Sequence, residues 1–297
     1  MNAARFLRKC LTDQAAAWIS AKLVMRGVYD KIYWQFRPGK PMVWRVPGGG
    51  KISLIPGHPF THSFWPAVDA YEPEVTGFFR HFVRPGMTVI DCGSNIGFFS
   101  VLAGKLVGPG GTVLAIEANP GTYKLVQHNL AINGYGKVIH CAITNTPGEV
   151  EIFMPAAGDV YSSLRTGKLV PKDGDLKSWR VPGRTLDEVV QSEGLSRVDI
   201  IKMDIEGGEV DGLRSASATL DRFRPLAIIE YGMNTWPSFG ATPEQILALA
   251  EAHRYSVVRF DLATKSFGPL PANIWDQPYD SLVLVPRERR MIPESHA

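Results

Sequence analysis

The chain has 297 residues, of which 45% are hydrophobic and 21% charged, as in an ordinary globular protein that can bury a sizeable core. It holds no run of about 18 apolar residues, so the sequence predicts no transmembrane helix. Its three cysteines form neither a CxxC pair nor a zinc-type spacing with histidine, which argues against a zinc site and favours a reducing compartment. We expect Cys92 and Cys141, which lie in apolar runs, to be small buried hydrophobic residues.

Positive charge is concentrated near the N-terminus. Residues 1–60 contain ten Lys or Arg and two Asp or Glu, although the whole chain carries a formal net charge of only +3. A basic arm on a mildly acidic body favours contact with something anionic, such as a membrane surface or an acidic glycan. A solvated cationic extension explains the pattern equally well. We therefore expect a cytoplasmic protein whose N-terminus is a candidate for peripheral contact with the inner membrane face.

The first 66 residues differ in character from the rest. Residues 1–36 are typical of one or two amphipathic helices. Residues 37–66 are rich in Gly, Pro and aromatic residues, which favours short strands and turns. We interpret 1–66 as a basic N-terminal cap of helical and β structure, followed by a main domain over 67–297.

The main domain alternates strands with helices. Strands are predicted at 88–91, 112–116, 137–143, 149–154, 198–203, 225–231, 256–260 and 281–285. Helices are predicted at 74–82, 98–107, 120–133, 186–192, 209–220 and 243–253. The alternation predicts an α/β fold with a mostly parallel sheet of about seven strands joined by crossover helices.

The first chemical motif follows the first predicted strand of the main domain and ends at Gly97. Gly93 lets the chain turn and lets a ligand approach the backbone closely. The N–H groups of the loop and the dipole of the following helix favour an anionic group such as a carboxylate or phosphate. Asp91 can take an ammonium group or a water, and Asn95 offers both a donor and an acceptor. A plain strand–helix turn would explain one glycine but not this combination.

The second motif is Glu117, which ends the next strand twenty residues after Gly97. An acidic side chain at that place can accept hydrogen bonds from both ribose hydroxyls of an adenosine cofactor. Asn95 stands where a dinucleotide fingerprint needs its second glycine, and no glycine stands three residues after Gly97. A pyrophosphate would be crowded there, so a cofactor that ends in an amino acid fits better.

The segment from about Glu72 to Tyr231 resembles the FkbM-type methyltransferases, a class I family that uses S-adenosyl-L-methionine. The resemblance covers slightly more than half of the chain and leaves out the first 60 residues, so the choice of substrate is not carried over. Cys92 and Ser94 stand where Val and Ala are commoner in the family. The matching pieces are Arg84-Pro85-Gly86, residues 89–100, Glu117-Ala118-Asn119-Pro120, Ala142, Thr185-Leu186-Asp187 and, most distinctive, residues 198–209.

This resemblance implies a Rossmann-like fold with a seven-stranded, mostly parallel sheet whose last strand is antiparallel. It makes 67–297 the S-adenosylmethionine-binding methyltransferase domain and implies O-methylation, often of sugars, glycolipids or polyketide-type products. Together with the two motifs, it assigns cofactor binding to Asp91, Gly93, Ser94, Asn95, Gly97, Glu117, Ala118, Asn119 and Ala142.

Acidic residues gather at the end of the predicted strand 198–203. In open α/β sheets ligands sit at that edge, which makes Lys202, Asp204 and Glu206 candidate catalytic residues. Lys202 and Asp204 point to the same side of the strand, so they could form an ion pair. Glu206 and Glu209 open a helix, where carboxylates also favour the dipole, so helix caps and ion pairs are the structural alternative.

Other candidates are weaker. Glu230 ends the next strand and faces the same edge, where it could act in catalysis or, with Asp204, bind a divalent metal. Structural carboxylates are the alternative to that metal site. His58 and His62 in the cap are further candidate bases, Ser162 and Ser163 could line an acceptor channel, and His140 is expected in the core.

The sequence therefore predicts an S-adenosylmethionine-dependent O-methyltransferase that acts on a hydroxyl of a sugar, glycolipid or secondary metabolite. Carboxylates suit a hydroxyl acceptor, which loses its proton as it attacks the methyl carbon. The Asn/Asp-Pro-Pro-aromatic loop typical of amine methyltransferases is replaced by Asp204-Ile205-Glu206-Gly207, which disfavours nucleic-acid bases. The alternatives are a nicotinamide-dependent oxidoreductase, a non-catalytic nucleoside-binding protein and an RNA or DNA methyltransferase.

Overall fold

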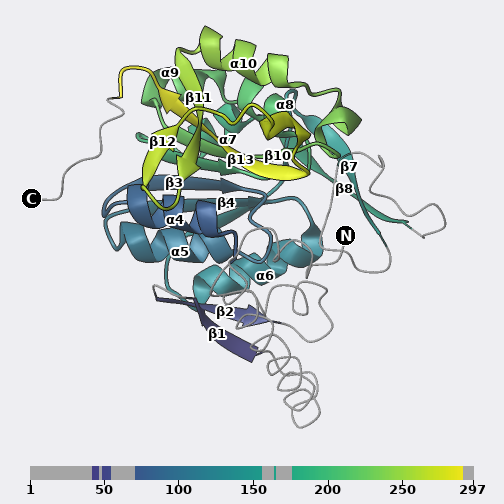
Figure 1. Ribbon diagram of the computed structural model, residues 1–297. Helices are drawn as coiled ribbons and strands as arrows, with labels where there is room; N and C mark the ends of the chain where they lie inside the picture. The colour runs from purple at the N-terminus through teal and green to yellow at the C-terminus, as the bar shows by residue number, and fades with distance from the viewer. Residues whose placement is uncertain (1–41, 47–48, 55–70, 156–163, 165–175, 290–297) are drawn as a thin grey trace, which may run out of the picture.

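The computed structural model describes residues 42–46, 49–54, 71–155, 164 and 176–289. Its centre is an eight-stranded sheet with the strand order β12-β11-β13-β10-β9-β3-β4-β5 (Figure 1). These strands span Thr88–Cys92 (β3), Thr112–Glu117 (β4), Lys137–His140 (β5), Ile200–Met203 (β9), Leu226–Gly232 (β10), Tyr255–Asp261 (β11), Ser266–Gly268 (β12) and Tyr279–Pro286 (β13).

Strand directions confirm the predicted α/β fold. The strands from β5 through β4, β3 and β9 to β10 are all parallel to their neighbours. The last strand, β13, runs antiparallel between β10 and β11. Seven of the eight predicted strands therefore lie in this sheet, and the short β12 adds an antiparallel eighth beside β11 at its edge.

Helices cover both faces of this sheet (Figure 1). One face packs on α4 (Pro73–Phe82), α5 (Phe98–Val107) and α6 (Pro120–Ala131). The other packs on α7 (Leu186–Ser192), α8 (Glu209–Arg214), α9 (Ser217–Phe223) and α10 (Pro243–Ala252). Two short 3-10 turns, η2 (Trp236–Phe239) and η3 (Ile274–Asp276), lie in the loops on either side of α10 and β11. None of the described helices is long and apolar enough to cross a membrane.

The predicted helix 209–220 is in fact two helices, and that prediction was wrong. Ser215 separates α8 from α9, and its side chain and carbonyl accept hydrogen bonds from the N–H groups of Leu186 and Asp187. Asp187 in turn accepts bonds from the N–H groups of Ala218 and Thr219 at the start of α9. Because α7 supplies these partners, the chain begins a new helix instead of continuing the old one.

The predicted strand 137–143 also divides. β5 ends at His140, whereas β6 (Ala142–Ile143) belongs to a separate three-stranded sheet. In that small sheet β8 (Leu176–Arg184) lies between β6 and β7 (Gly148–Pro155). β7 was predicted as a strand and β8 was not. The chain thus passes from one sheet to the other at Cys141, which is buried.

A hairpin from the N-terminal region packs beneath α5 and α6 (Figure 1). It consists of β1 (Met42–Val46) and β2 (Gly50–Leu54), in the region where short strands and turns were expected. Asn129 of α6 is fully buried and accepts a hydrogen bond from the Ser53 N–H at 2.7 Å. The same side chain donates to the Ile96 carbonyl at 2.8 Å, so it joins the hairpin to the turn after β3. The helices expected in 1–36 lie outside the described residues.

Candidate active site

The turn after β3 is folded against the loop after β9. Gly93 has a φ of +74°, a conformation that favours glycine. A Cβ atom on Gly93 would lie 1.8 Å from the Asp204 carbonyl oxygen, so no larger residue fits without movement. Asn95 and Gly97 also have positive φ, and Gly97 is the N-cap residue of α5. The glycine of the first motif therefore allows the turn after β3 to approach the backbone of the loop after β9 closely.

Glu117 points toward this turn. One carboxylate oxygen accepts the Asn95 N–H and the other accepts the Asn119 N–H, each at 2.8 Å. The side chain is 7% exposed, and burial raises its pKa to about 7 although both N–H groups favour the charged form. Since each carboxylate oxygen has a second lone pair, Glu117 can still accept hydrogen bonds from a ligand.

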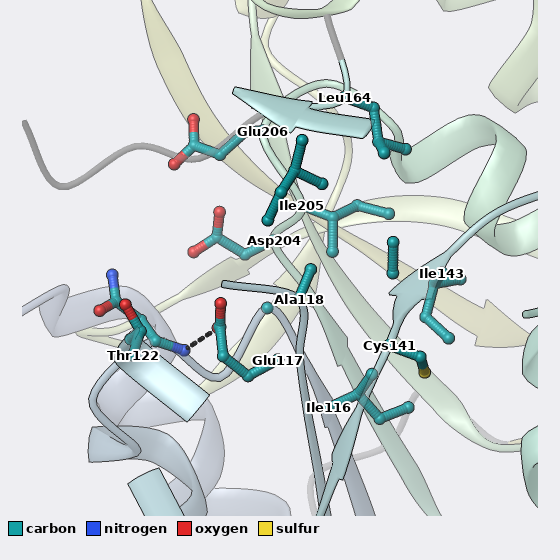
Figure 2. A pocket seen from close by; sticks show the side chains of 14 residues that line it. Ile116, Glu117, Ala118, Thr122, Cys141, Ile143, Leu164, Asp204, Ile205 and Glu206 are labelled. Carbon is teal, nitrogen blue, oxygen red and sulfur yellow. Dashed lines mark hydrogen bonds between the residues drawn. The ribbon is translucent and has the colours of Figure 1, made fainter. Parts of the chain in front are cut away.

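An open cavity lies between the turn and the end of β9. It holds about 690 Å³, including solvent at its mouth. Figure 2 shows the carboxylates of Glu117, Asp204 and Glu206 along one side, with Cys141 and Ile143 on the other. The full lining is Gly93, Asn95, Ile116, Glu117, Ala118, Thr122, Cys141, Ala142, Ile143, Ile152, Leu164, Asp204, Ile205 and Glu206. The cavity is thus charged along one wall and apolar along the other.

The predicted cofactor residues fall into two groups. Gly93, Asn95, Glu117, Ala118 and Ala142 line the cavity. The other four support its walls: Asp91 and Ser94 are buried, Gly97 is the N-cap residue of α5, and Asn119 caps α6 by accepting the Gly121 N–H at 2.8 Å.

Lys202 is a buried cation between carboxylates. Its Nζ lies 3.1 Å from Asp204 Oδ2 and 3.8 Å from Asp91 Oδ1, so the predicted ion pair with Asp204 is present. Burial alone would lower the pKa of Lys202, but Asp204, Asp91 and Glu72 hold it well above its usual range. Asp91 accepts a hydrogen bond from Ser100 Oγ at 2.5 Å through Oδ2, while its Oδ1 has no hydrogen-bond partner.

The neighbouring glutamates differ in their roles. Glu209 is 1% exposed, and its Oε1 accepts the N–H groups of Ile205 at 2.8 Å and Gly207 at 3.2 Å. Glu209 therefore holds the loop after β9 in place. This is a structural role, which was the alternative to a chemical role for the acidic residues here. Glu206 lines the cavity from a left-handed backbone conformation, with φ of 59°. Burial raises the pKa of Glu206 well above its usual value, and nearby Asp204 and Glu209 raise it further.

Glu230 lies in β10, two residues before the strand ends at Gly232, and burial followed by the charge of Asp204 raises its pKa. The metal hypothesis for Asp204 and Glu230 gains no support, because no group of three or more His, Cys, Asp or Glu among the described residues is arranged to hold a metal ion. His58, His62, Ser162 and Ser163 lie outside the described residues.

His140 is half-buried, and its Nε2 forms a hydrogen bond with the Ala118 carbonyl at 2.9 Å. Its ring also stacks on Tyr123 at a centroid distance of 4.6 Å. Cys92 and Cys141 are buried free thiols, as predicted.

Sequence reasoning missed Tyr71 and Glu72, which precede α4. Burial raises the pKa of Glu72 to about 7, Lys202 lowers it and Asp204 raises it. The charge of Glu72 is thus linked electrostatically to the charged groups at the end of β9. No motif marks these residues, because only the packing of α4 beside the sheet brings them to this edge.

Comparison with known proteins agrees with this geometry. A family model described as the methyltransferase FkbM domain matches residues 91–257. Methyltransferase sdnD of Sordaria araneosa is 26% identical over 198 residues, which are 58% of this chain and 74% of that protein. The 31-O-demethyl-FK506 methyltransferase FkbM of Streptomyces tacrolimicus is 28% identical over 213 residues, which are 61% of this chain and 78% of that protein.

Two solved structures are also similar. One is a methyltransferase FkbM of Methylobacillus flagellatus, with 17% identity and a TM-score of 0.40. The match covers 76% of this chain and 53% of that one, so the chain spans about half the length of that protein. The other is the Aeropyrum pernix fibrillarin bound to S-adenosyl-L-methionine, with 11% identity, a TM-score of 0.44, and coverage of 84% and 85%.

Proposed function

Because the chain belongs to the FkbM methyltransferase family, we propose that it is an S-adenosylmethionine-dependent O-methyltransferase. The proposed acceptor is a hydroxyl of a sugar, a glycolipid or a secondary metabolite. The observation that carries the proposal is the cavity at the carboxyl ends of β3, β4 and β9, with carboxylates on one wall and apolar side chains on the other.

The residues of the cavity support a proposed role for each part of the cofactor. Glu117 would accept hydrogen bonds from the ribose hydroxyls, and Ala118, Ala142 and Ile143 offer an apolar surface for the adenine. The turn at Gly93 would receive the amino-acid end, close to Oδ1 of Asp91, which accepts no hydrogen bond and faces Lys202 Nζ at 3.8 Å. When bound, S-adenosylmethionine supplies an electrophilic methyl group. The chain's own contribution is alignment of the reactants and exclusion of water.

Transfer to oxygen is supported by the acidic character of the site. Asp204 and Glu206 line the cavity, and Glu72 and Glu230 are electrostatically linked to them. Carboxylates can accept the proton that a hydroxyl loses on methylation. One relative is named a 31-O-demethyl-FK506 methyltransferase, a name that refers to an oxygen acceptor in that protein.

Two measurements test the proposal. Isothermal titration should show binding of S-adenosylhomocysteine but not of NAD, because Asn95 stands where a dinucleotide fingerprint needs its second glycine; the reverse result favours an oxidoreductase. Labelled methyl transfer into the glycan, lipid, small-metabolite and nucleic-acid fractions of a lysate should place the label in the glycan, lipid or small-metabolite fraction. Label in the nucleic-acid fraction, with binding that weakens strongly as salt is raised, would favour the RNA or DNA alternative. Cofactor binding without transfer into any fraction would favour a non-catalytic nucleoside-binding protein.

A further inference from the structure

Lys202 lies behind the cavity wall, whereas Asp204 forms part of that wall. The Lys202 side chain is 5% exposed and does not line the cavity, but the Asp204 side chain is 22% exposed and does. Lys202 Nζ donates a hydrogen bond to Asp204 Oδ2 at 3.1 Å. Lys202 therefore acts on a ligand in the cavity through Asp204 and not by direct contact.

The ammonium group of Lys202 is held from two elements. In the sheet Lys202 is in register with Asp91 of β3, whose Oδ1 lies 3.8 Å from Lys202 Nζ. The other oxygen of Asp91 accepts a hydrogen bond from Ser100 Oγ of α5 at 2.5 Å. The ring centre of Phe99, also in α5, lies 5.0 Å from Nζ. The position of this cation is thus set by β3 and α5 together.

The backbone of Asp204 is fixed independently of its side chain. Its N–H donates to the Cys92 carbonyl at 3.1 Å, and its own carbonyl oxygen lies against Gly93. These contacts place the Cα atom but leave the side-chain torsions open. The hydrogen bond from Lys202 restricts them. Because it engages Oδ2, the other carboxylate oxygen can accept a hydrogen bond from a ligand.

Stability alone does not explain a lysine at this place. The other residues of β9, Ile200, Ile201 and Met203, are apolar and buried. Taking two charges out of water costs free energy that their attraction often only repays, so a buried ion pair is weak evidence for stability. A polar residue that breaks the pattern of a buried strand is expected at a functional site.

Asp204 also differs from the other carboxylates on the cavity wall. Glu117 accepts two backbone N–H groups, and burial raises the pKa of Glu206 well above its usual value, which favours its neutral form. An opposite charge at the distance of Lys202 favours the ionised form of a carboxylate. The titratable groups on which the charge of Asp204 acts, besides Lys202, are Tyr71 and the carboxyls of Glu72, Asp91, Glu117, Glu206, Glu209 and Glu230.

We infer that Asp204 is the catalytic base for the acceptor hydroxyl and that Lys202 is the positioning residue that holds its carboxylate. This inference rests on the proposed function. The hydroxyl proton moves to an Asp204 oxygen as the acceptor oxygen forms a bond to the methyl carbon. The carbon–sulfur bond breaks with its electron pair remaining on sulfur, so the sulfonium charge is neutralised and a thioether is released.

A double-mutant cycle tests the link between the two residues. We measure labelled methyl transfer into the lysate fraction that accepts label from the wild-type protein. Asp204→Asn should lower kcat about 10²–10⁴-fold, the usual contribution of a general base. Lys202→Met should lower kcat about 10²-fold, the cost of misplacing a reacting group by about 1 Å. The double variant should be no slower than Asp204→Asn alone, because Lys202 then has no base to hold. The KM for S-adenosylmethionine should stay within about two-fold of wild type throughout.

Arg197→Met is the matched control. Arg197 pairs with Asp199 at 2.7 Å, with the same two-residue spacing, just before β9 begins and so at the opposite end of the strand from the cavity. This change should leave kcat unchanged. A loss equal to that of Lys202→Met would show a general effect of removing a cation beside β9, and would overturn the inference.

The pH profile of kcat separates positioning from a purely structural role. Loss of the positive charge disfavours the ionised base, so the acid limb in Lys202→Met should move to higher pH by about 1–3 units. Lys202→Arg keeps the charge, so its acid limb should stay at the wild-type pH and part of the rate should be recovered. Asp204→Asn should lose the acid limb.

The two proposals fail in different ways. If the wild-type protein labels no hydroxyl-bearing fraction, the proposed function is wrong. If it does, but Asp204→Asn keeps the wild-type kcat, Asp204 is not the base. If the losses in Lys202→Met and Asp204→Asn multiply in the double variant, Lys202 does not act through Asp204. Should Lys202→Met fail to fold, the same cycle with Lys202→Arg decides between these results.

Discussion

Burial controls the acidity of three glutamates around the cavity. The pKa values of Glu72, Glu117 and Glu209 are each raised to about 7, and burial is the largest cause in every case. Removing a carboxylate from water disfavours its charged form. These residues therefore change charge near neutral pH, unlike the exposed acids of the surface.

Glu117 is expected to contribute directly to cofactor affinity. Glu117→Ala removes the acceptor for the ribose hydroxyls and leaves the N–H groups of Asn95 and Asn119 without their partner. Hydrogen bonds to a charged group contribute about 1.5–3 kcal/mol, so the Kd for S-adenosylhomocysteine should rise at least about ten-fold. Isothermal titration measures this. Glu149→Ala, which removes an exposed carboxylate, should leave the Kd unchanged.

Glu209 gives the stability of the protein a predictable pH dependence. Its folded pKa of about 7 lies above its ordinary value of 4.5, so between these values the folded chain keeps a proton that the unfolded chain has lost. The free energy of unfolding should therefore fall as pH rises from about 4.5 to about 7, by up to about 3 kcal/mol from this residue. Urea unfolding of Glu209→Gln should show a shallower fall. If the free energy of unfolding of Glu209→Gln falls with pH as steeply as that of the wild type, Glu209 is not the source of the pH dependence.

The sequence predicts some site residues better than others. Glu117 is recognisable from the sequence because it ends a predicted strand twenty residues after Gly97, and neighbouring strands of a parallel sheet end at the same edge. No motif of this kind includes Glu72. Its position depends on how α4 packs beside α5 and on an aromatic stack, and neither is encoded in local spacing.

At the scale of elements, the turn after β3 and the loop after β9 form one unit. Gly93→Ala would place a methyl group 1.8 Å from the Asp204 carbonyl in a backbone conformation with positive φ. The loops must separate, so cofactor binding should be lost and Tm should fall. Gly86→Ala is the matched control, since Gly86 has a φ of +80° and no atom within 4 Å of the added methyl. Calorimetry and cofactor titration of both variants test this; similar effects in the two would show that backbone strain alone is responsible.

Helix boundaries were predictable where capping residues mark them. α7 follows the predicted bounds, because Thr185 and Glu188 form a reciprocal capping box. The division at Ser215 was not predictable, because the groups that end α8 and begin α9 come from α7. β8 was missed because Pro182, Gly183 and several charged residues interrupt its pattern, and its ladder with β6 and β7 is a tertiary feature.

At the scale of the whole molecule, Asn129 connects three parts of the chain. It bonds the Ser53 N–H and carbonyl of the hairpin and the Ile96 carbonyl in the turn after β3. Asn129→Ala leaves these buried groups unpaired, which should lower the free energy of unfolding by about 2–4 kcal/mol. Urea unfolding measures the loss. Asn133→Ala, which removes the more exposed bonds to Lys51, should cost less, and an equal or larger loss there would contradict this account.

The division of the chain at Cys141 has a consequence for ligand binding. Ile116 belongs to the central sheet and Ile143 to the small one, and both line the same cavity. A ligand that fills this cavity therefore contacts two sheets, which the backbone joins at Cys141 alone. Ligand binding should fix the orientation of the small sheet relative to the central sheet. It should also stabilise the folded protein by mass action.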